Sequence, residues 1–213
     1  MKPYYEHNGI TIYHGDAREI FPTLDTPDLI LTDPPYGIDY KGCPASKKKN
    51  IGLIHDGIQG DAELMDLRFV LRADCEVVSF GANNYPEQLP HRGRWICWDK
   101  RTCENADRML GSPFELAWQN RDHGYYTMIR IMHGGVVNAD RTGKRVHPTQ
   151  KPLALMHRII DLYPKCETIT DPFMGSGTTL RAAKDRGRKA IGIEIDEKYC
   201  EIAARRLAQE VLF

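Results

Sequence analysis

Apolar positions along the chain alternate or form short β-branched runs in some segments and follow helical spacing in others. The first pattern predicts strands at residues 10–14, 29–32, 76–81, 94–100, 113–119, 127–133, 168–171 and 190–196. Helical spacing predicts helices at residues 17–24, 61–74, 153–163, 178–185 and 199–210. The last third alternates strand and helix, as in a parallel α/β sheet, whereas strands between residues 94 and 133 follow one another directly. We therefore expect an α/β fold with a mixed, mostly parallel sheet and an antiparallel edge.

Composition narrows the class of protein. The length of 213 residues predicts one domain, residues 1–213. The composition, with 41% apolar and 27% charged residues, is ordinary for a globular protein. Lys plus Arg and Asp plus Glu balance at 29 each, so any phosphate binding must come from local patches. The six cysteines lack metal-site spacing and suggest reduced thiols, and no signal peptide or membrane span is evident. We expect a cytoplasmic protein without a metal site.

Asp33-Pro34-Pro35-Tyr36 is the first candidate site, and it directly follows the apolar run at residues 29–32. Neither proline can donate to a sheet ladder, so the strand stops there. Ligands bind at this carboxyl edge in open α/β sheets. The Asp33 carboxylate and the Pro34 carbonyl are two acceptors, which suit an exocyclic NH2 group, and Tyr36 offers a face for a planar base. A plain strand-ending turn explains the same residues equally well.

Gly175 and Gly177 form the second candidate site, between a predicted strand and a predicted helix. Such a turn lets a ligand approach the backbone and the helix N–H groups. Glu194 ends the next strand, where an acid can accept both hydroxyls of a ribose. Neither a phosphate-loop pattern nor a full GxGxxG is present, so a nucleoside cofactor without a pyrophosphate fits best. The competing interpretation is a tight turn with no ligand.

Loops are the predicted place for target recognition, around residues 41–60, 101–111 and 121–146, because loops on a rigid scaffold usually carry specificity. The first loop holds Lys47, Lys48 and Lys49. A lysine run is either a solvated surface or a phosphate contact. The other candidate DNA contacts are likewise basic: Lys100, Arg101, Arg141, Lys144 and Arg145.

Three motifs in a fixed order resemble the amino-group DNA methyltransferases, which use S-adenosylmethionine (SAM) to methylate adenine N6 or cytosine N4. They are Asp33-Pro34-Pro35-Tyr36, His-Pro-Thr-Gln-Lys-Pro at residues 147–152, and Asp-Pro-Phe-Met-Gly-Ser-Gly at residues 171–177. The catalytic motif precedes the cofactor motif, as in the β group, whose methyltransferase sheet is circularly permuted. The resemblance spans nearly the whole chain and implies a Rossmann-like SAM-dependent methyltransferase fold.

The resemblance also assigns roles to residues. Asp33, Pro34, Pro35 and Tyr36 match the catalytic turn, and Glu194 matches the acid on the cofactor's ribose. Asp16, in Gly-Asp-Ala, resembles the acid at the cofactor's adenine, although capping the next helix explains it as well. Thr149 and Lys151 match a loop over the cofactor's carboxylate. The remaining implied cofactor contacts flank these motifs: Ala17, Asp171, Phe173, Gly175, Ser176, Gly177, Thr178 and Ile195.

The implied reaction is methyl transfer to an amine of a base flipped out of double-stranded DNA. Asp rather than Ser at the start of the catalytic motif favours adenine N6, with cytosine N4 as the alternative. Cys43-Pro44 reverses the Pro-Cys order of carbon-5 cytosine enzymes. An RNA amino-group methyltransferase and an inactive SAM- or DNA-binding subunit are further alternatives. Family likeness also suggests a homodimer and allows a companion restriction endonuclease.

Overall fold

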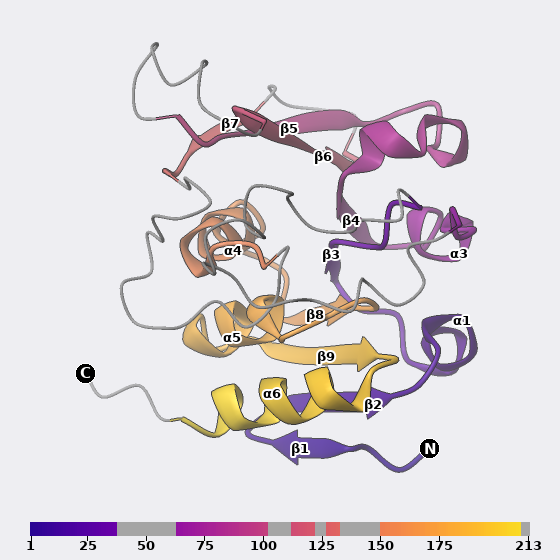
Figure 1. The fold of residues 1–213 in the computed structure, drawn as a ribbon, viewed down its shortest axis with the longest axis vertical. Helices are drawn as coiled ribbons and strands as arrows, with labels where there is room; N and C mark the ends of the chain where they lie inside the picture. The colour runs from indigo at the N-terminus through magenta and orange to yellow at the C-terminus, as the bar shows by residue number, and fades with distance from the viewer. Residues whose placement is uncertain (38–62, 102–111, 122–126, 133–149, 210–213) are drawn as a thin grey trace, which may run out of the picture.

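The computed structural model describes residues 1–37, 63–101, 112–121, 127–132 and 150–209. Within these residues, nine strands form one sheet (Figure 1). In spatial order they are β1 (Tyr5–His7), β2 (Ile10–His14), β9 (Lys189–Glu194), β8 (Thr168–Asp171), β3 (Leu29–Thr32), β4 (Glu76–Phe80), β6 (Phe114–Gln119), β5 (Arg94–Asp99) and β7 (Thr127–Arg130).

Strand direction confirms the mixed, mostly parallel sheet. The run from β2 through β9, β8 and β3 to β4 is parallel throughout. The antiparallel part arises because β6 inserts between β4 and β5 and runs against both, while β7 is parallel to β5. A third antiparallel pair, β1 with β2, was not predicted from the sequence.

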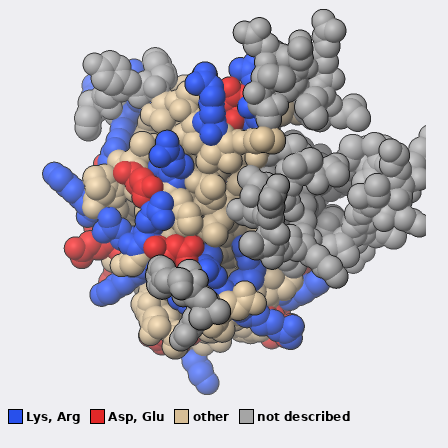
Figure 2. Space-filling model, turned by 90° about the vertical axis from the view of Figure 1, so that its left-hand side faces the viewer, with Lys and Arg blue, Asp and Glu red and all other residues tan. Residues whose placement is uncertain are grey.

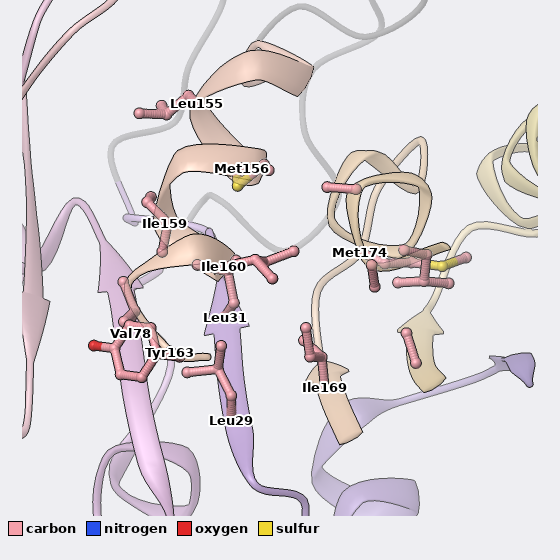
Figure 3. Packing of buried hydrophobic residues seen from close by; sticks show 14 of the residues in the cluster. Leu29, Leu31, Val78, Leu155, Met156, Ile159, Ile160, Tyr163, Ile169 and Met174 are labelled. Atoms are coloured by element: carbon pink, nitrogen blue, oxygen red, sulfur yellow. The ribbon is translucent and has the colours of Figure 1, made fainter. Parts of the chain in front are cut away.

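Helices cover both faces of the sheet (Figure 1). One face carries α4 (Leu153–Asp161), α5 (Thr178–Asp185) and α6 (Glu197–Ala208), and the other carries α1 (Ala17–Ile20) and α3 (Arg68–Leu71). Figure 3 shows Leu155, Met156 and Ile159 of α4 packed over β3 and its neighbours. Leu29 and Leu31 of β3 point into this cluster, whereas Ile30 packs with the residues of α3. Strand β3 is thus buried on both faces, as its continuous apolar run predicts.

Two predicted helices are shorter than expected. Pro22 has no N–H to donate, so α1 ends at Ile20 and a 3-10 turn, Phe21–Thr23, follows. The helix predicted at residues 61–74 is reduced to α3, and Leu64, which precedes it, is exposed. The side chain of Gln88 explains part of this, because it binds the carbonyl of Met65 and the amide of Leu67. Residues 61 and 62 lie outside the described part of the chain.

The parallel strands β2, β9, β8, β3 and β4 end at one edge of the sheet. Their carboxyl ends lead into Asp16, Glu194, Asp171, Asp33 and Gly81. Because β6 runs the opposite way, its first residues lie at this same edge. The two motifs singled out in the sequence are therefore neighbours.

Among the described helices, none has the length and apolar character needed to cross a membrane. Within the same residues, no group of three or more His, Cys, Asp or Glu side chains could hold a metal ion.

Candidate active site

Asp33 follows β3 directly and has a partner on each carboxylate oxygen. Lys151 Nζ donates to Oδ2 at 2.5 Å, and the Tyr36 hydroxyl donates to Oδ1. The preceding residue, Thr32, is buried and donates its hydroxyl to Asp171 at 2.8 Å. The candidate catalytic turn is therefore bound to β8 through Thr32 and to Lys151 through Asp33.

Tyr36 lies against Gly81 at the end of β4. Gly81 has a φ of 64°, and a Cβ atom there would lie 2.0 Å from Cε1 of the Tyr36 ring. Only glycine allows this approach in this conformation. Burial, followed by the nearby Asp33 charge, raises the pKa of Tyr36 well above its usual value. The phenol therefore stays protonated and acts as a donor to Asp33.

Lys151 is placed by helix α4, which begins immediately after Pro152 and packs on β3. Its side chain is only 7% exposed, and its ammonium lies 3.3 Å from Glu115 Oε2 in addition to its contact with Asp33. Burial alone lowers the pKa of Lys151, but attraction to Asp33 and Glu115 outweighs it, so the pKa is raised. The resemblance implied a cofactor contact for Lys151; in the structure its ammonium contacts Asp33, the candidate catalytic acid.

The glycine turn connects β8 to α5. Gly177 has a φ of 78°, and a Cβ atom there would lie 2.8 Å from Cβ of Ala203 in α6. The amide of Gly175 donates to Glu194 Oε2 at 2.9 Å, and the amide of Asp196 donates to Oε1 at 2.8 Å. Burial raises the pKa of Glu194, although these two amides oppose the shift. Glu194 thus holds the turn while keeping lone pairs for further donors.

Asp171 joins the two motifs. Its Oδ1 accepts from Thr32 and, at 3.1 Å, from the amide of Phe173. The residue is 3% exposed, and this burial raises the pKa of Asp171 to about 6. The nearby charge of Asp33 acts in the same direction.

Other predicted cofactor residues lie along the same edge. Asp16 caps α1 by accepting from the amide of Arg18, which confirms the capping role, and Gly15 donates to the carbonyl of Glu194 at 2.9 Å. The backbone and side-chain oxygens of Ser176 both accept from Arg206 of α6. The burial of the others differs: Ala17 and Thr178 are buried, Phe173 is half-buried and Ile195 is exposed.

Predicted DNA contacts fall into two groups. Lys100 forms an ion pair with Glu115, and Arg101 forms one with Asp99, so both charges are already paired within the protein. The rest lie outside the described residues, as does the cofactor candidate Thr149: Lys47, Lys48, Lys49, Arg141, Lys144 and Arg145. Figure 2 shows basic side chains interleaved with acidic ones on the face it presents.

Comparisons with known proteins place the chain. The sequence profile of a family described as DNA methylase (N6_N4_Mtase) matches residues 118–205. Type II methyltransferase M2.DpnII of Streptococcus pneumoniae is 51% identical over 250 residues, covering 98% of this chain and 93% of that protein. The chain belongs to the DNA methylase family. Type II methyltransferase M.ScaI of Streptomyces caespitosus is 27% identical, over 98% of this chain and 84% of that protein.

Solved structures agree with this DNA methylase fold. A crystal structure of the M1.HpyAVI–SAM complex matches with a TM-score of 0.56 and 25% identity, covering 94% of this chain and all of that one. PvuII DNA methyltransferase, described as cytosine-N4-specific, matches with a TM-score of 0.63 and 14% identity, over 100% and 91%. The second likeness, at this identity, concerns the fold alone.

The side chains at this edge fit SAM. The cofactor carries a positive sulfonium and a ribose, and the edge offers the carboxyl groups of Asp33, Asp171 and Glu194. Glu194 uses one hydrogen bond on each oxygen, and a carboxylate has about four acceptor positions, so two remain for ribose hydroxyls. The side-chain oxygen of Gln150, next to Lys151, is buried without a hydrogen-bond partner among the described residues, which leaves an acceptor for a ligand N–H.

Sequence reasoning missed Glu115, Gln150 and Arg206. Glu115 carried one readable signal, since it is an acid inside the otherwise apolar strand run Phe-Glu-Leu-Ala-Trp. Gln150 lay inside the quoted motif but was given no role. Arg206 gave no local signal, because its link to Ser176 depends on how α6 packs against the glycine turn.

Proposed function

We propose that this DNA methylase transfers a methyl group from SAM to the N6 amine of an adenine flipped out of duplex DNA. The observation that carries the proposal is the position of Asp33. Its carboxylate lies between Lys151 and Tyr36, at the same sheet edge as Glu194 and the glycine turn. The proposed acceptor for the target amine, Asp33, therefore lies next to the proposed nucleoside site at Glu194.

Asp33 and the carbonyl of Pro34 would accept the two N–H groups of the target amine. Two such acceptors favour the pyramidal amine, whose lone pair is free to attack, over the planar amine conjugated with the ring. SAM supplies an electrophilic methyl group when bound. Asp33 already accepts from Lys151 and Tyr36, and an ionised carboxylate keeps about two further acceptor positions for the base.

Tyr36 would stack on the flipped base. A base inside a duplex cannot reach a site at the edge of a sheet, so it must leave the stack. An aromatic face compensates part of that cost. Gly81 supports the ring from behind, which limits where Tyr36 can move.

Glu194, Asp16 and the turn from Phe173 to Thr178 would hold the cofactor, with Glu194 on its ribose hydroxyls. Thr149 and Gln150 are the candidates from the segment before α4. Lys151 would contribute mainly through Asp33, because its ammonium is already shared by two carboxylates.

Adenine is the proposed base because the motif begins with Asp rather than Ser. Membership of the DNA methylase family supports DNA as the substrate. Recognition by loops 41–60, 101–111 and 121–146, a homodimer and a companion restriction endonuclease stay predictions. Sedimentation of the purified protein with and without DNA measures the subunit number directly.

The deciding experiment is transfer from isotope-labelled SAM to mixed-sequence duplex DNA, followed by nucleoside digestion and mass spectrometry. We expect N6-methyladenine with the natural protein and none with Asp33→Ala, while SAM binding measured by calorimetry stays nearly unchanged. Asp33→Asn, which preserves the side-chain shape, should also be inactive. Formation of N4-methylcytosine would contradict adenine as the target base. Label transferred to RNA in a parallel reaction would contradict DNA as the substrate. Loss of SAM binding in Asp33→Ala would assign Asp33 to the cofactor site instead.

A further inference from the structure

Glu115 lies between two lysines close to the catalytic acid. Lys100 Nζ is 2.5 Å from its Oε1 and Lys151 Nζ is 3.3 Å from its Oε2. Lys151 in turn contacts Asp33 at 2.5 Å. Charges therefore alternate along a continuous path from Lys100 through Glu115 and Lys151 to Asp33, with two positive and two negative groups.

Strand pairing puts Glu115 in this place. It is the second residue of β6 and lies opposite Trp98 of β5 in the antiparallel register. Lys100 follows β5, donates its amide to the carbonyl of Pro113, and has its ammonium 4.9 Å from the centre of the Trp98 ring. Glu115 is thus fixed by a β-ladder, whereas Lys151 reaches it from the start of α4.

The Lys151 ammonium needs Glu115. A buried ammonium is costly unless it is paired and hydrogen-bonded, and Lys151 is 7% exposed. Its contacts to Asp33 and Glu115 use two of three N–H donors, and the third faces the Tyr36 hydroxyl at 3.4 Å. Without Glu115, Asp33 would be the one charged partner of this long flexible side chain among the described residues.

We propose that Glu115 is a positioning residue for methyl transfer, which holds the charged Lys151 in place so that Asp33 is presented in one orientation to the target amine. Glu115 itself contacts neither base nor cofactor in this proposal. The proposal rests on the proposed function, since the amine acceptor is Asp33. It assigns a role in catalysis to the inserted strand β6.

The test compares Glu115→Gln with a matched control, Glu76→Gln. Glu76 is also a strand glutamate, with a side-chain exposure of 34% against 33% for Glu115, and it pairs with Arg121 at the opposite edge of the sheet. We expect kcat to fall at least about tenfold in Glu115→Gln, the effect of losing one charge-assisted hydrogen bond, with little change in KM for SAM. Glu76→Gln should match the natural protein.

The pH profile separates positioning from folding. Attraction to Asp33, and after it to Glu115, raises the pKa of Lys151, so a neutral replacement of Glu115 should lower that pKa relative to the natural protein. Lys151 would then lose its proton at lower pH. Because the proposal requires a charged Lys151, the alkaline limb of the pH profile of kcat should move to lower pH. Glu115→Asp, which keeps the charge, should restore the position of that limb.

Two results with Glu115→Gln would overturn the proposal. One is a lower kcat that is accompanied by lower thermal stability, with no change in the alkaline limb of the pH profile. The other is an unchanged kcat in a folded variant. A readout independent of activity is the titration of Lys151 by NMR in protein with 13Cε-labelled lysine, assigned with Lys151→Met. A lower Lys151 pKa in Glu115→Gln is expected, and an unchanged value overturns the proposal. If the natural protein methylates no DNA base, the proposed function fails, while this titration still decides whether Glu115 keeps Lys151 charged.

Discussion

The ammonium of Lys151 lies 2.5 Å from a carboxylate oxygen of Asp33, although the two residues are 118 positions apart in the sequence. One follows strand β3 and the other precedes helix α4, and the packing of α4 on β3 brings them together. Removing one member of a buried ion pair leaves the other uncompensated. For that reason Asp33→Asn, which leaves a polar partner for Lys151, belongs beside Asp33→Ala in any test of catalysis.

Tyr36 makes two separable contributions, the ring face and the hydroxyl that donates to Asp33. Tyr36→Ala should reduce kcat/KM for DNA by roughly 5- to 150-fold, because base stacking on an aromatic ring contributes about 1–3 kcal/mol. Tyr36→Phe keeps the ring and should retain most of the activity. Steady-state kinetics measures both variants, and equal losses in the two would assign the effect to the hydroxyl instead of stacking.

Glu194 should control SAM affinity. Glu194→Ala removes the proposed acceptor of the ribose hydroxyls and also frees the amides of Gly175 and Asp196. We expect the dissociation constant to rise by about 10- to 100-fold, since a hydrogen bond to a charged group contributes roughly 1.5–3 kcal/mol. Calorimetry measures it, with Glu197→Gln as the control because that acid is exposed three positions later. An unchanged constant would remove Glu194 from the cofactor site.

Asp171 should make stability depend on pH. Its pKa is raised from 3.8 to about 6 by burial, so the fold favours the protonated acid. The stabilising effect of the raised pKa is complete below the unfolded value and is lost as pH rises through about 6. The free energy of unfolding, relative to Asp171→Asn, should therefore fall by about 2 kcal/mol between about pH 4 and pH 7. Urea titrations measure this, and a constant difference would contradict the raised pKa.

Lys47, Lys48 and Lys49 should contribute to the salt dependence of DNA binding. If each contacts one phosphate, replacing all three by Gln should reduce the slope of log K against log salt concentration by about 2.7. Fluorescence anisotropy with a labelled duplex at several salt concentrations measures the slope. An unchanged slope in the triple variant would indicate that these lysines belong to a solvated surface and do not contact DNA phosphates.

Local chemistry explains what the sequence predicted well. Apolar runs, proline stops and glycine turns act over a few residues, so β3, β8, α5 and the two motifs at their ends were readable from the chain alone. The helix predicted at residues 61–74 was too long, because contacts distant in sequence also act on this segment. Its periodicity was local, but the side chain of Gln88, from a later turn, binds the backbone at Met65 and Leu67.

The sequence by itself determined the family, the order of the two candidate motifs, and the parallel strands that bear them, because each depends on a short run of residues. Only the tertiary structure decided that β6 enters between β4 and β5, that Glu115 meets Lys100 and Lys151, and that Lys151 binds Asp33. These contacts join segments far apart in the chain. Their energies depend on burial and distance, which no local pattern encodes.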